Sequence, residues 1–461
     1  MICFQRLLYI PLLTLTLLAC GNDNNISNGS TSLQTSEHNA AERCSPTKLP
    51  TSQHMVTSWR TAPSDALITH PISALTVRQF FAPHHDSDRI RLRLSNHYSN
   101  VPVTLENIHI AKEATPGKAE LQPNTECLLT FAGKSKITIA AGESAVSDTI
   151  SYPVRAFERV GVSFYAPTLT PQITRHLNAN EILFMSIPGD FTKDPSATPF
   201  IAVPDGYTSN FLAIEALEVA APKGVRTIVT VGDSITDGSG STTQILSGLS
   251  SPMTSSDQRY PNHLQRRILE AKLPFTVANA GIGGNELIND ALLPQFGASL
   301  LKRFDHDVLS VTGLSHILLM IGTNDLGNPK LGQSITPEDL ITGYKSLIKR
   351  AHQANVKLIL GTIPPAEGTV LKGLPILGNL PLPIGILHGS AEAKKSRDAA
   401  NAWIRTQTLS DGIVDFDQCL ADPQNPGYLA DEFNSGDNLH PSPAGYLAMA
   451  ECIDLNLFIT H

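Results

Sequence analysis

Two short segments of the C-terminal half carry the residue types of a serine nucleophile and its base. Gly232-Asp233-Ser234 places a serine directly after a β-branched stretch, and Asp437-Asn438-Leu439-His440 places a carboxylate three residues before a histidine. A neutral imidazole can take up a serine proton near neutral pH, and a carboxylate fixes its tautomer and stabilises the imidazolium. The two segments together predict acyl transfer through Ser234, with His440 as the base and Asp437 as its orienting carboxylate.

Two further segments supply hydrogen-bond donors of the kind that stabilise an oxyanion. Residues 279–285 form a glycine-rich run whose backbone can approach a ligand closely, and Gly322-Thr323-Asn324-Asp325 places an amide after an apolar stretch. The tetrahedral intermediate of ester hydrolysis needs several donors aimed at one oxygen. The N–H of Ser234, the N–H of Gly284 and the amide of Asn324 are donors of the right type. Seen alone, either segment would be interpreted as an ordinary tight turn.

The elements that must position these segments follow from the pattern around them. Strands are expected over 226–232, 275–279, 315–321, 356–362 and 412–416, and helices over 260–272, from Thr336 onward, over 391–406 and over 443–457. Strands that alternate with helices predict crossover connections and a parallel sheet covered on both faces. Open sheets of this kind bind ligands beyond the carboxyl ends of their strands, where these segments are expected.

The region before this alternation has a period of two. Residues 89–94 alternate strictly between arginine and apolar side chains, and later short runs continue the pattern between turn residues. Such runs, with no helical stretch among them, predict an antiparallel β-sandwich. We expect this domain to cover 55–220 and the α/β domain to cover 225–461. The three arginines of the first run predict a solvated sheet face, and a ligand-binding face is the alternative.

Length and composition limit the function classes. The chain of 461 residues is long enough for two or three domains, and its hydrophobic fraction of 41% can supply their cores. The 34 Lys and Arg against 42 Asp and Glu leave a formal net charge of −8. A protein that binds nucleic acid electrostatically needs a cationic surface, so a nucleic-acid partner is not expected.

Residues 1–20 have the composition of an export signal. Arg6 precedes an apolar run that is too short to span a bilayer. The run ends in Leu-Ala-Cys-Gly, which resembles the box in which a lipoprotein signal is cut and Cys20 is acylated. We therefore expect an outer-membrane lipoprotein, exported to the periplasm or the cell surface and anchored through this lipid; an ordinary secretory signal is the alternative. The polar residues 21–50 are expected to form a flexible tether.

Four more cysteines lie in the exported part of the chain: Cys44, Cys127, Cys419 and Cys452. An even number in an exported protein suggests two disulfides, and the positions favour Cys44 with Cys127 and Cys419 with Cys452 among three connectivities. Four free buried thiols are the alternative. No close pair has the spacing of zinc ligands, so no metal site is expected.

Taken in order, the serine, glycine, asparagine and histidine segments resemble the blocks of the SGNH or GDSL-type hydrolases. The resemblance implies Ser234 as nucleophile, with Asp437 and His440 as orienter and base. It implies an oxyanion hole made by the Ser234 N–H, Gly284 and Asn324. It also implies a flavodoxin-like α/β/α sandwich and a reaction that uses no metal and no cofactor.

A longer match is similar to the acetyl-xylan-esterase-like branch of this family, which carries an N-terminal β domain. The match rests on Arg259-Tyr260-Pro261 and on the runs at 279–285, 303–308 and 414–417. Thr323 stands where an isoleucine often precedes the asparagine in that branch. A larger departure is the apolar insert at 370–389, which is rich in leucine, isoleucine, proline and glycine.

The resemblance implies a serine esterase whose substrates carry short acyl groups, such as acetyl groups on polysaccharide. The apolar insert favours an alternative, a lipid-directed esterase or lysophospholipase, because an apolar loop can receive an acyl chain. We expect the insert to line the acyl or leaving-group side of the pocket, and a packing role is the alternative. A surface carbohydrate-binding lipoprotein with an inactive hydrolase domain is a third hypothesis, against which the complete set of site residues argues.

Overall fold

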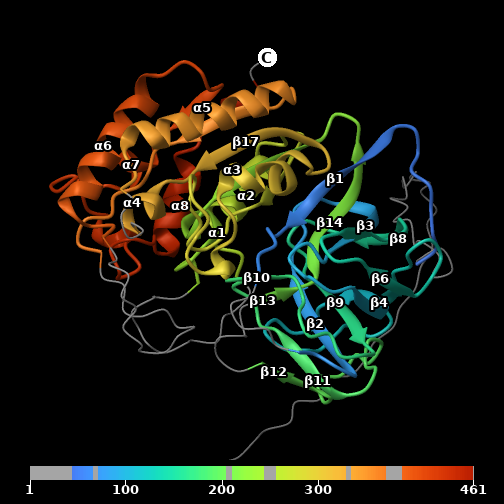
Figure 1. Ribbon diagram of the computed structural model, residues 1–461. Coiled ribbons are helices and arrows are strands. Elements are labelled where there is room, and N and C mark those ends of the chain that lie inside the picture. The colour runs from blue at the N-terminus through green and yellow to red at the C-terminus, as the bar shows by residue number, and fades with distance from the viewer. Residues whose placement is uncertain are drawn as a thin grey trace, which may run out of the picture. The chain divides into compact units, whose positions relative to one another are not determined.

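The computed structural model describes residues 44–65, 71–203, 210–242, 256–328, 334–369 and 387–459 (Figure 1). All of them belong to one compact unit, Ala40–His461. The predicted signal, Cys20, most of the predicted tether and positions 370–386 of the apolar insert lie outside the described residues. No helix in the described part of the chain is long and apolar enough to cross a membrane.

The N-terminal part is antiparallel and β-rich, as predicted. Its strands are β1 Gln53–Arg60, β2 Leu75–Phe81, β3 Ser87–Ser95, β4 Val103–Lys112, β5 Cys127–Leu128, β6 Lys136–Ile139, β7 Ser144–Val146, β8 Ile150–Val154, β9 Val160–Ala166, β10 Arg175–Leu177, β11 Phe184–Pro188, β12 Phe200–Ala202, β13 Asn210–Leu212 and β14 Ile214–Pro222. One sheet has the order β1-β14-β3-β7, with β8 also paired to β3. A second has the order β12-β11-β2-β9-β4-β5, with β6 paired to β4, and β10 pairs with β13.

The alternation in β3 shows why this region folds as strands. The apolar residues of the 89–94 run are fully buried in a core to which both large sheets contribute, and the arginines lie on the opposite face. The pattern predicts that this face is solvated, but the structure shows that two of its arginines are engaged in ion pairs. Arg91 and Arg93 pair with the buried carboxylate of Glu218, which also accepts a hydrogen bond from the Thr312 hydroxyl. The arginines therefore neutralise a charge at the contact with the C-terminal part.

The chain is held to the β-rich region from Cys44 onward. The N–H of Cys44 donates to the backbone carbonyl of Ser151 at 2.8 Å, and the N–H of Thr47 donates to that of Thr149 at 2.9 Å. The last residues of the predicted tether, 44–50, thus follow β8 in this structure.

The C-terminal part is built on a parallel sheet, as predicted. Its strands are β15 Arg226–Gly232, β16 Phe275–Asn279, β17 Leu314–Met320, β18 Lys357–Gly361 and β19 Gly412–Val414, paired in the order β16-β15-β17-β18-β19. Because all these pairs are parallel, the carboxyl ends of the strands meet at one edge. The serine, glycine and asparagine segments follow β15, β16 and β17 at that edge.

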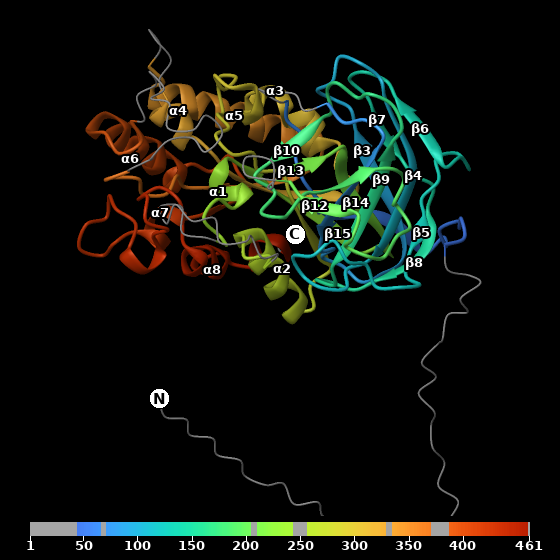
Figure 2. The same ribbon diagram turned by 90° about the horizontal axis from the view of Figure 1, so that it is seen from below.

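Helices pack on both faces of this sheet. They include α1 Ser234–Asp237, α2 Tyr260–Glu270, α3 Leu300–Phe304, α4 Thr323–Gly327, α5 Pro337–Gln353, α6 Ala391–Thr406, α7 Phe416–Leu420, α8 Pro443–Glu451 and α9 Asn456–Ile459. One hydrophobic cluster contains Val229 and Val231 of β15 with α3, α5 and α6. A second contains Ile228 with α2, α7 and α8. Figure 2 shows α3 and α5 on one side and α2 and α8 on the other.

Two helix ends show how local sequence sets the boundaries. Thr336 caps α5, the helix expected from this residue onward: its hydroxyl accepts from the N–H of Asp339, and the Asp339 carboxylate accepts from the N–H of Thr336. The expected closing helix over 443–457 is wrong in extent, because α8 ends at Glu451. The Asp454 side chain accepts from the N–H of Asn456 at 2.9 Å and so begins α9 as a separate helix.

Buried charges join the β-rich region to the α/β region. Arg60 of β1 donates to Glu215 of β14 at 2.7 Å and lies 3.7 Å from Asp307, which pairs with Arg303 at 2.9 Å. Burial opposes ionisation of Asp307, but His306, Arg303 and Arg60 outweigh it and lower the pKa of this carboxyl to about 2. Asp307 is therefore ionised in neutral solution, and each charge in the group has a partner of opposite sign.

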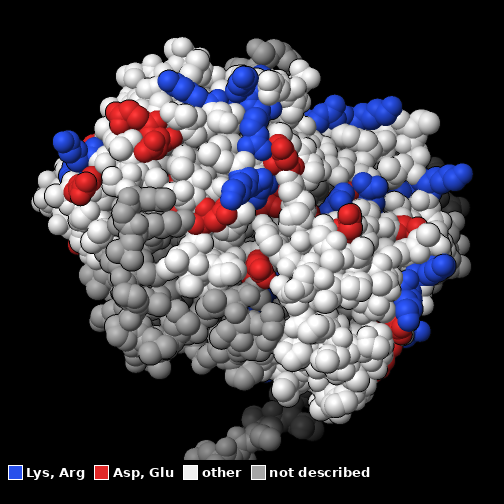
Figure 3. Space-filling model, viewed as in Figure 1, with Lys and Arg blue, Asp and Glu red and all other residues white. Residues whose placement is uncertain are grey.

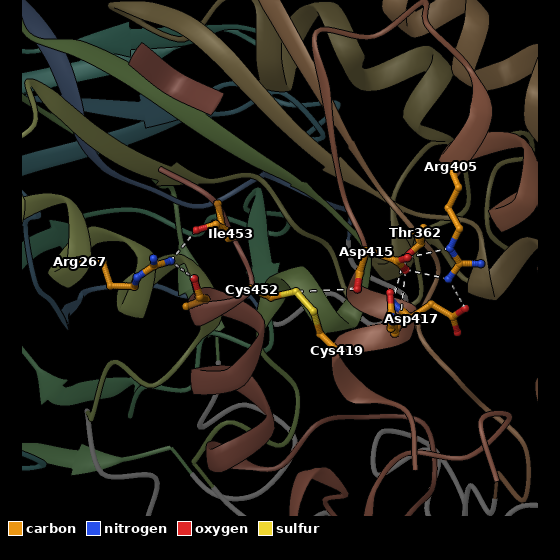
Figure 4. The surroundings of a disulfide bond; sticks show 10 residues. Arg267, Thr362, Arg405, Asp415, Asp417, Cys419, Cys452 and Ile453 are labelled. Carbon is orange, nitrogen blue, oxygen red and sulfur yellow. Dashed lines mark hydrogen bonds and ion pairs between the residues drawn. A yellow bond between two sulfur atoms is a disulfide. The ribbon is translucent and has the colours of Figure 1, made fainter. Parts of the chain in front are cut away.

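Two disulfides join the cysteines in the predicted pairs. Cys44 is bonded to Cys127 and Cys419 to Cys452. The second bond links α7 to the end of α8 (Figure 4). The chain between its two cysteines contains the histidine segment, so the bond closes a loop around the candidate base.

The surface in one view reflects the low content of charge. On the face in Figure 3, Lys and Arg are interspersed with Asp and Glu, and uncharged residues cover most of the described area. This agrees with a charged fraction of 16% for the whole chain, well below the usual value of about 25%.

Candidate active site

Ser234 is the first residue of α1, a single helical turn that follows β15. The Asp233 side chain caps this turn by accepting from the N–H of Ile235 at 3.0 Å. The turn ends at Gly238, whose N–H donates to the Ser234 carbonyl at 2.8 Å. This junction of strand and helix holds the serine at the carboxyl edge of the sheet.

A series of short hydrogen bonds joins Ser234 to His440 and Asp437. The Nε2 atom of His440 lies 2.8 Å from Ser234 Oγ, and its Nδ1 atom lies 2.6 Å from Asp437 Oδ2. Because an ionised carboxylate only accepts hydrogen bonds, the imidazole proton is on Nδ1 and Nε2 can accept the serine proton. This is the geometry that activation of a serine by a general base requires.

The histidine segment holds Asp437 through its own backbone. Asp437 Oδ1 accepts from the N–H of Leu439 at 2.9 Å and from the N–H of His440 at 2.8 Å, and the side chain is fully buried. Burial opposes ionisation, but the imidazole of His440 and these N–H groups outweigh it, so the pKa of Asp437 lies below its ordinary value. Asp437 is therefore a carboxylate wherever His440 can act as a base.

The glycine segment lies against α1. The N–H of Gly283 donates to Asp237 Oδ2 at 2.9 Å. Gly284 has a φ of 73°, in the left-handed region that favours glycine, and a Cβ there would lie 2.6 Å from the ring of Phe296. Within the described residues, no hydrogen bond engages the N–H of Gly284.

The asparagine segment is bonded to the glycine segment. Asn324 Nδ2 donates to the backbone carbonyl of Asn285 at 3.0 Å. The neighbouring Asp325 accepts from the N–H of Leu287 at 2.8 Å and from the N–H of Ile288 at 2.9 Å. These contacts fix the two segments relative to each other.

The predicted site residues are thus distributed as follows. Ser234, His440 and Asp437 are in direct contact. Gly284 and Asn324 lie on neighbouring, hydrogen-bonded segments at the same edge of the sheet. The candidate lipidation site, Cys20, lies outside the described residues.

Arg303 contacts the serine and glycine segments, a role that sequence reasoning did not assign. Its buried guanidinium donates to the backbone carbonyls of Gly232 at 3.0 Å and Ala280 at 2.9 Å, and to the Asn285 side chain at 2.9 Å. The planar fork of arginine suits several acceptors at once. The sequence around Arg303 does not indicate these contacts, because the groups that accept its hydrogen bonds come from separate loops.

His176 of β10 reaches the site from the β-rich region and was also missed. Its Nε2 atom lies 3.0 Å from Asp237 Oδ1, and its Nδ1 atom lies 2.8 Å from the Ala62 carbonyl. The ring thus connects the backbone that follows β1 to α1 through one contact at each nitrogen. Since Asp237 also accepts from Gly283, the β-rich region supports the glycine segment.

Asp233 carries a buried carboxyl group next to Ser234. It takes no part in the hydrogen bonds that join Ser234, His440 and Asp437. Burial raises the pKa of Asp233 to about 7, although the hydrogen bond from Ile235 and the proximity of His440 oppose the shift. The folded state therefore binds a proton at Asp233 that the unfolded state releases between about pH 4 and 7. The contribution of Asp233 to the free energy of unfolding is therefore most favourable at low pH, and it is lost as the pH rises from about 4 to about 7.

Asp233→Asn should therefore stabilise the protein increasingly as the pH rises. The gain in free energy of unfolding over the wild type should grow by about 2 to 3 kcal/mol between about pH 5 and pH 8, since the pKa shift is from 3.8 to about 7. Asparagine keeps an oxygen for the N–H of Ile235. Urea unfolding at both pH values measures the difference, with the exposed Asp431→Asn as control. An equal gain at both pH values would contradict the assignment.

Among the described residues there is no group of three or more His, Cys, Asp or Glu side chains that could hold a metal ion.

Comparison with known proteins adds a family match. Residues 230–448 match the model of the GDSL-like Lipase/Acylhydrolase family. No curated protein matches the chain. The matched range contains every residue of the hydrogen-bonded series, from Ser234 to His440.

Several solved structures are similar to about half of the chain. An esterase from Pseudoalteromonas sp. is 17% identical, with a TM-score of 0.31 over 49% of this chain and 93% of that one. A carbohydrate acetylesterase from Sinorhizobium meliloti is 15% identical, with a TM-score of 0.34 over 49% and 94% of the two chains. An aryl esterase from M. smegmatis is 15% identical, with a TM-score of 0.36 over 49% and 95%.

Proposed function

We propose that this chain, whose residues 230–448 match the GDSL-like Lipase/Acylhydrolase family, hydrolyses carboxylic esters through a covalent acyl-enzyme on Ser234. The observation that carries the proposal is the hydrogen-bonded series from Ser234 through His440 to Asp437. It supplies a nucleophile, a base and an orienting carboxylate, each within hydrogen-bonding distance of the next.

The reaction follows from these contacts in two steps. His440 accepts the hydroxyl proton as Ser234 Oγ attacks the ester carbonyl carbon, and the imidazolium then gives that proton to the leaving alkoxide oxygen. Water attacks the acyl-enzyme with His440 again as base, and the carboxylic acid leaves Ser234. Asp437 remains ionised and stabilises the imidazolium in both steps.

We assign the oxyanion hole to the N–H of Ser234, the N–H of Gly284 and the Nδ2 of Asn324. The hydrogen bond between Asn324 and the Asn285 carbonyl supports this, because it holds the amide next to the glycine segment. Donors fixed before the reaction stabilise the tetrahedral intermediate without reorganising.

We further propose that the preferred substrates carry short acyl groups, such as acetyl groups on polysaccharide. Phe296 supports this size limit, because its ring lies against Gly284 of the proposed oxyanion hole. The similarity to the acetyl-xylan-esterase-like branch, carried by Arg259-Tyr260-Pro261 and the later runs, also supports it.

A lipid-directed esterase or lysophospholipase is the second candidate, because Thr369, just before the apolar insert, and His388, near its C-terminal end, contact the site. The Thr369 hydroxyl lies 3.4 Å from the Asn438 carbonyl, and His388 lies 3.1 Å from the Asn324 side chain. Leu387, next to His388 in the sequence, is 43% exposed. The apolar composition of the insert favours a substrate with a longer acyl chain.

Hydrolysis of a series of p-nitrophenyl esters from acetate to palmitate, together with acetylated xylan, tests the proposal. We expect kcat/KM to be highest for acetate and to fall with chain length, and acetate to be released from the xylan. Ser234→Ala controls for spontaneous hydrolysis. A preference for octanoate or longer esters would favour the lipid-directed enzyme, and the absence of any hydrolysis that depends on Ser234 would contradict esterase activity.

We propose that the enzyme is an exported lipoprotein of the outer membrane, anchored through Cys20 and facing the periplasm or the cell surface. The apolar run that ends at Cys20 supports export, and the two disulfides support an oxidising compartment. We assign residues 55–220 to an accessory β-sandwich and residues 225–461 to a flavodoxin-like catalytic domain. The strand order β16-β15-β17-β18-β19 supports the second assignment.

A further inference from the structure

His388 is buried against the proposed oxyanion residue Asn324. It lies at the C-terminal end of the apolar insert, before α6, and is 5% exposed. Its Nε2 atom lies 3.1 Å from Asn324 Oδ1. The ring also lies on the backbone of Gly327, where a Cβ would come within 2.1 Å of it. His388 belongs to none of the four sequence segments and takes no part in the steps derived above.

The surroundings of Asn324 fix which way its amide points. The backbone carbonyl of Asn285, 3.0 Å away, can only accept a hydrogen bond, so the amide atom that faces it is Nδ2. Oδ1 then faces His388, whose Nε2 must donate. One N–H of the amide is engaged by Asn285, and the other can point to the oxyanion of the proposed reaction.

The protonation of His388 agrees with this geometry. Burial lowers the pKa of His388 to about 4, and His440 nearby adds to the effect, so the ring is neutral in neutral solution and carries one proton. Its Nδ1 atom is buried and has no hydrogen-bond partner in the described part of the chain. The proton therefore has an acceptor only at Nε2.

Packing alone does not explain a histidine at this place. A buried nitrogen without a partner destabilises the folded state, and an apolar side chain of similar size would avoid that cost. Among the described residues, the His388 ring makes one hydrogen bond, the contact with Asn324 Oδ1. The hydrogen bond to Asn324 therefore explains why an imidazole is found at this position.

We infer that His388 is a positioning residue of the oxyanion hole, which holds the Asn324 amide so that its second N–H points to the oxyanion. The inference rests on the proposed function and adds a residue to it. His388 acts through Asn324 and does not touch the reacting atoms. Because the oxyanion develops only after the serine attacks, the effect is expected in kcat and not in KM.

The first test compares kcat and KM for p-nitrophenyl acetate in two variants. His388→Leu removes the donor and should lower kcat by about 10- to 100-fold with KM changed by less than about threefold, since loss of a whole oxyanion donor costs about 10²- to 10³-fold. His388→Gln can place an amide N–H near the position of Nε2 and should recover most of the loss. Gly327→Ala should resemble His388→Leu, because its methyl group displaces the imidazole.

A double-mutant cycle separates positioning from packing. Asn324→Ala should lower kcat by about 10²- to 10³-fold, and His388→Leu should then add no more than about a twofold loss, because the amide it positions is gone. His109→Leu is the matched control, since His109 is also buried and bonded to a carbonyl but lies in β4. It should leave kcat unchanged.

Thermal unfolding by circular dichroism shows which variants are folded. Wild-type kcat in folded His388→Leu, or an equal loss with and without Asn324, would overturn the inference. If His388→Leu does not fold, Gly327→Ala carries the test, and wild-type kcat in folded Gly327→Ala would overturn the inference. Failure of the proposed function looks different, because the wild-type protein itself would then show no hydrolysis that depends on Ser234.

Discussion

Ser234→Ala is expected to lower the turnover of p-nitrophenyl acetate by about 10⁶-fold, the largest effect of any single change in this protein. The reason is that Ser234 Oγ is the atom that bonds to the acyl group, and it lies 2.8 Å from His440 Nε2, the base that activates it. The hydroxyl is small, so its removal leaves little empty volume. Steady-state assays that are corrected for spontaneous hydrolysis of the ester measure the loss of turnover.

The control for this variant is a serine outside the site. Ser310→Ala, whose hydroxyl bonds only to the His306 carbonyl in the described part of the chain, should keep wild-type turnover. The melting temperature of Ser234→Ala should stay within a few degrees of the wild type. Residual turnover within about a hundredfold of the wild type in a folded variant would mean that the nucleophile is another residue.

Asp437→Asn is expected to give the second largest effect, a loss of roughly 10⁴ in kcat with little change in KM. The Asp437 Oδ1 atom accepts two backbone N–H groups, so an asparagine would keep its oxygen there and turn its NH₂ group toward His440 Nδ1. That imidazole nitrogen must then accept, which moves the ring proton to Nε2. An Nε2 that carries a proton cannot take one from Ser234.

Steady-state kinetics of Asp437→Asn beside Asp431→Asn check this reasoning. Asp431 is an exposed carboxylate on the same loop, and its change should leave kcat as in the wild type. The size of the loss separates two accounts of Asp437. A decrease of tenfold or less would show that the backbone of the histidine segment, and not the carboxylate, sets the tautomer of His440.

The parts of the site that the sequence predicts are those encoded locally. Ser234 follows a β-branched strand, and Asp437 and His440 lie within one short turn, so residue type and spacing are enough to mark them. The parallel sheet follows in the same way from alternating patterns, and it explains why segments far apart in sequence meet at one edge. The cysteine positions favoured the pairing of Cys419 with Cys452 among three connectivities, and the structure confirms it.

The supporting residues could not be predicted, because their partners are distant in the sequence. Arg303 bonds to carbonyl groups of two separate loops, and His176 reaches Asp237 from the β-rich region. A buried polar side chain has no periodicity of its own, so only the fold shows that it is buried. The arginine face of β3 was misjudged for the same reason, since its partner Glu218 lies on β14.

Mass spectrometry after treatment with a fluorophosphonate tests the central claim most directly. The reagent forms a stable bond with an activated serine, so labelling reports the nucleophile without assuming a natural substrate. We expect a single adduct in the wild-type protein, on the peptide that contains Ser234, and no adduct in folded Ser234→Ala. An adduct on another residue, or labelling that persists in Ser234→Ala, would contradict that claim.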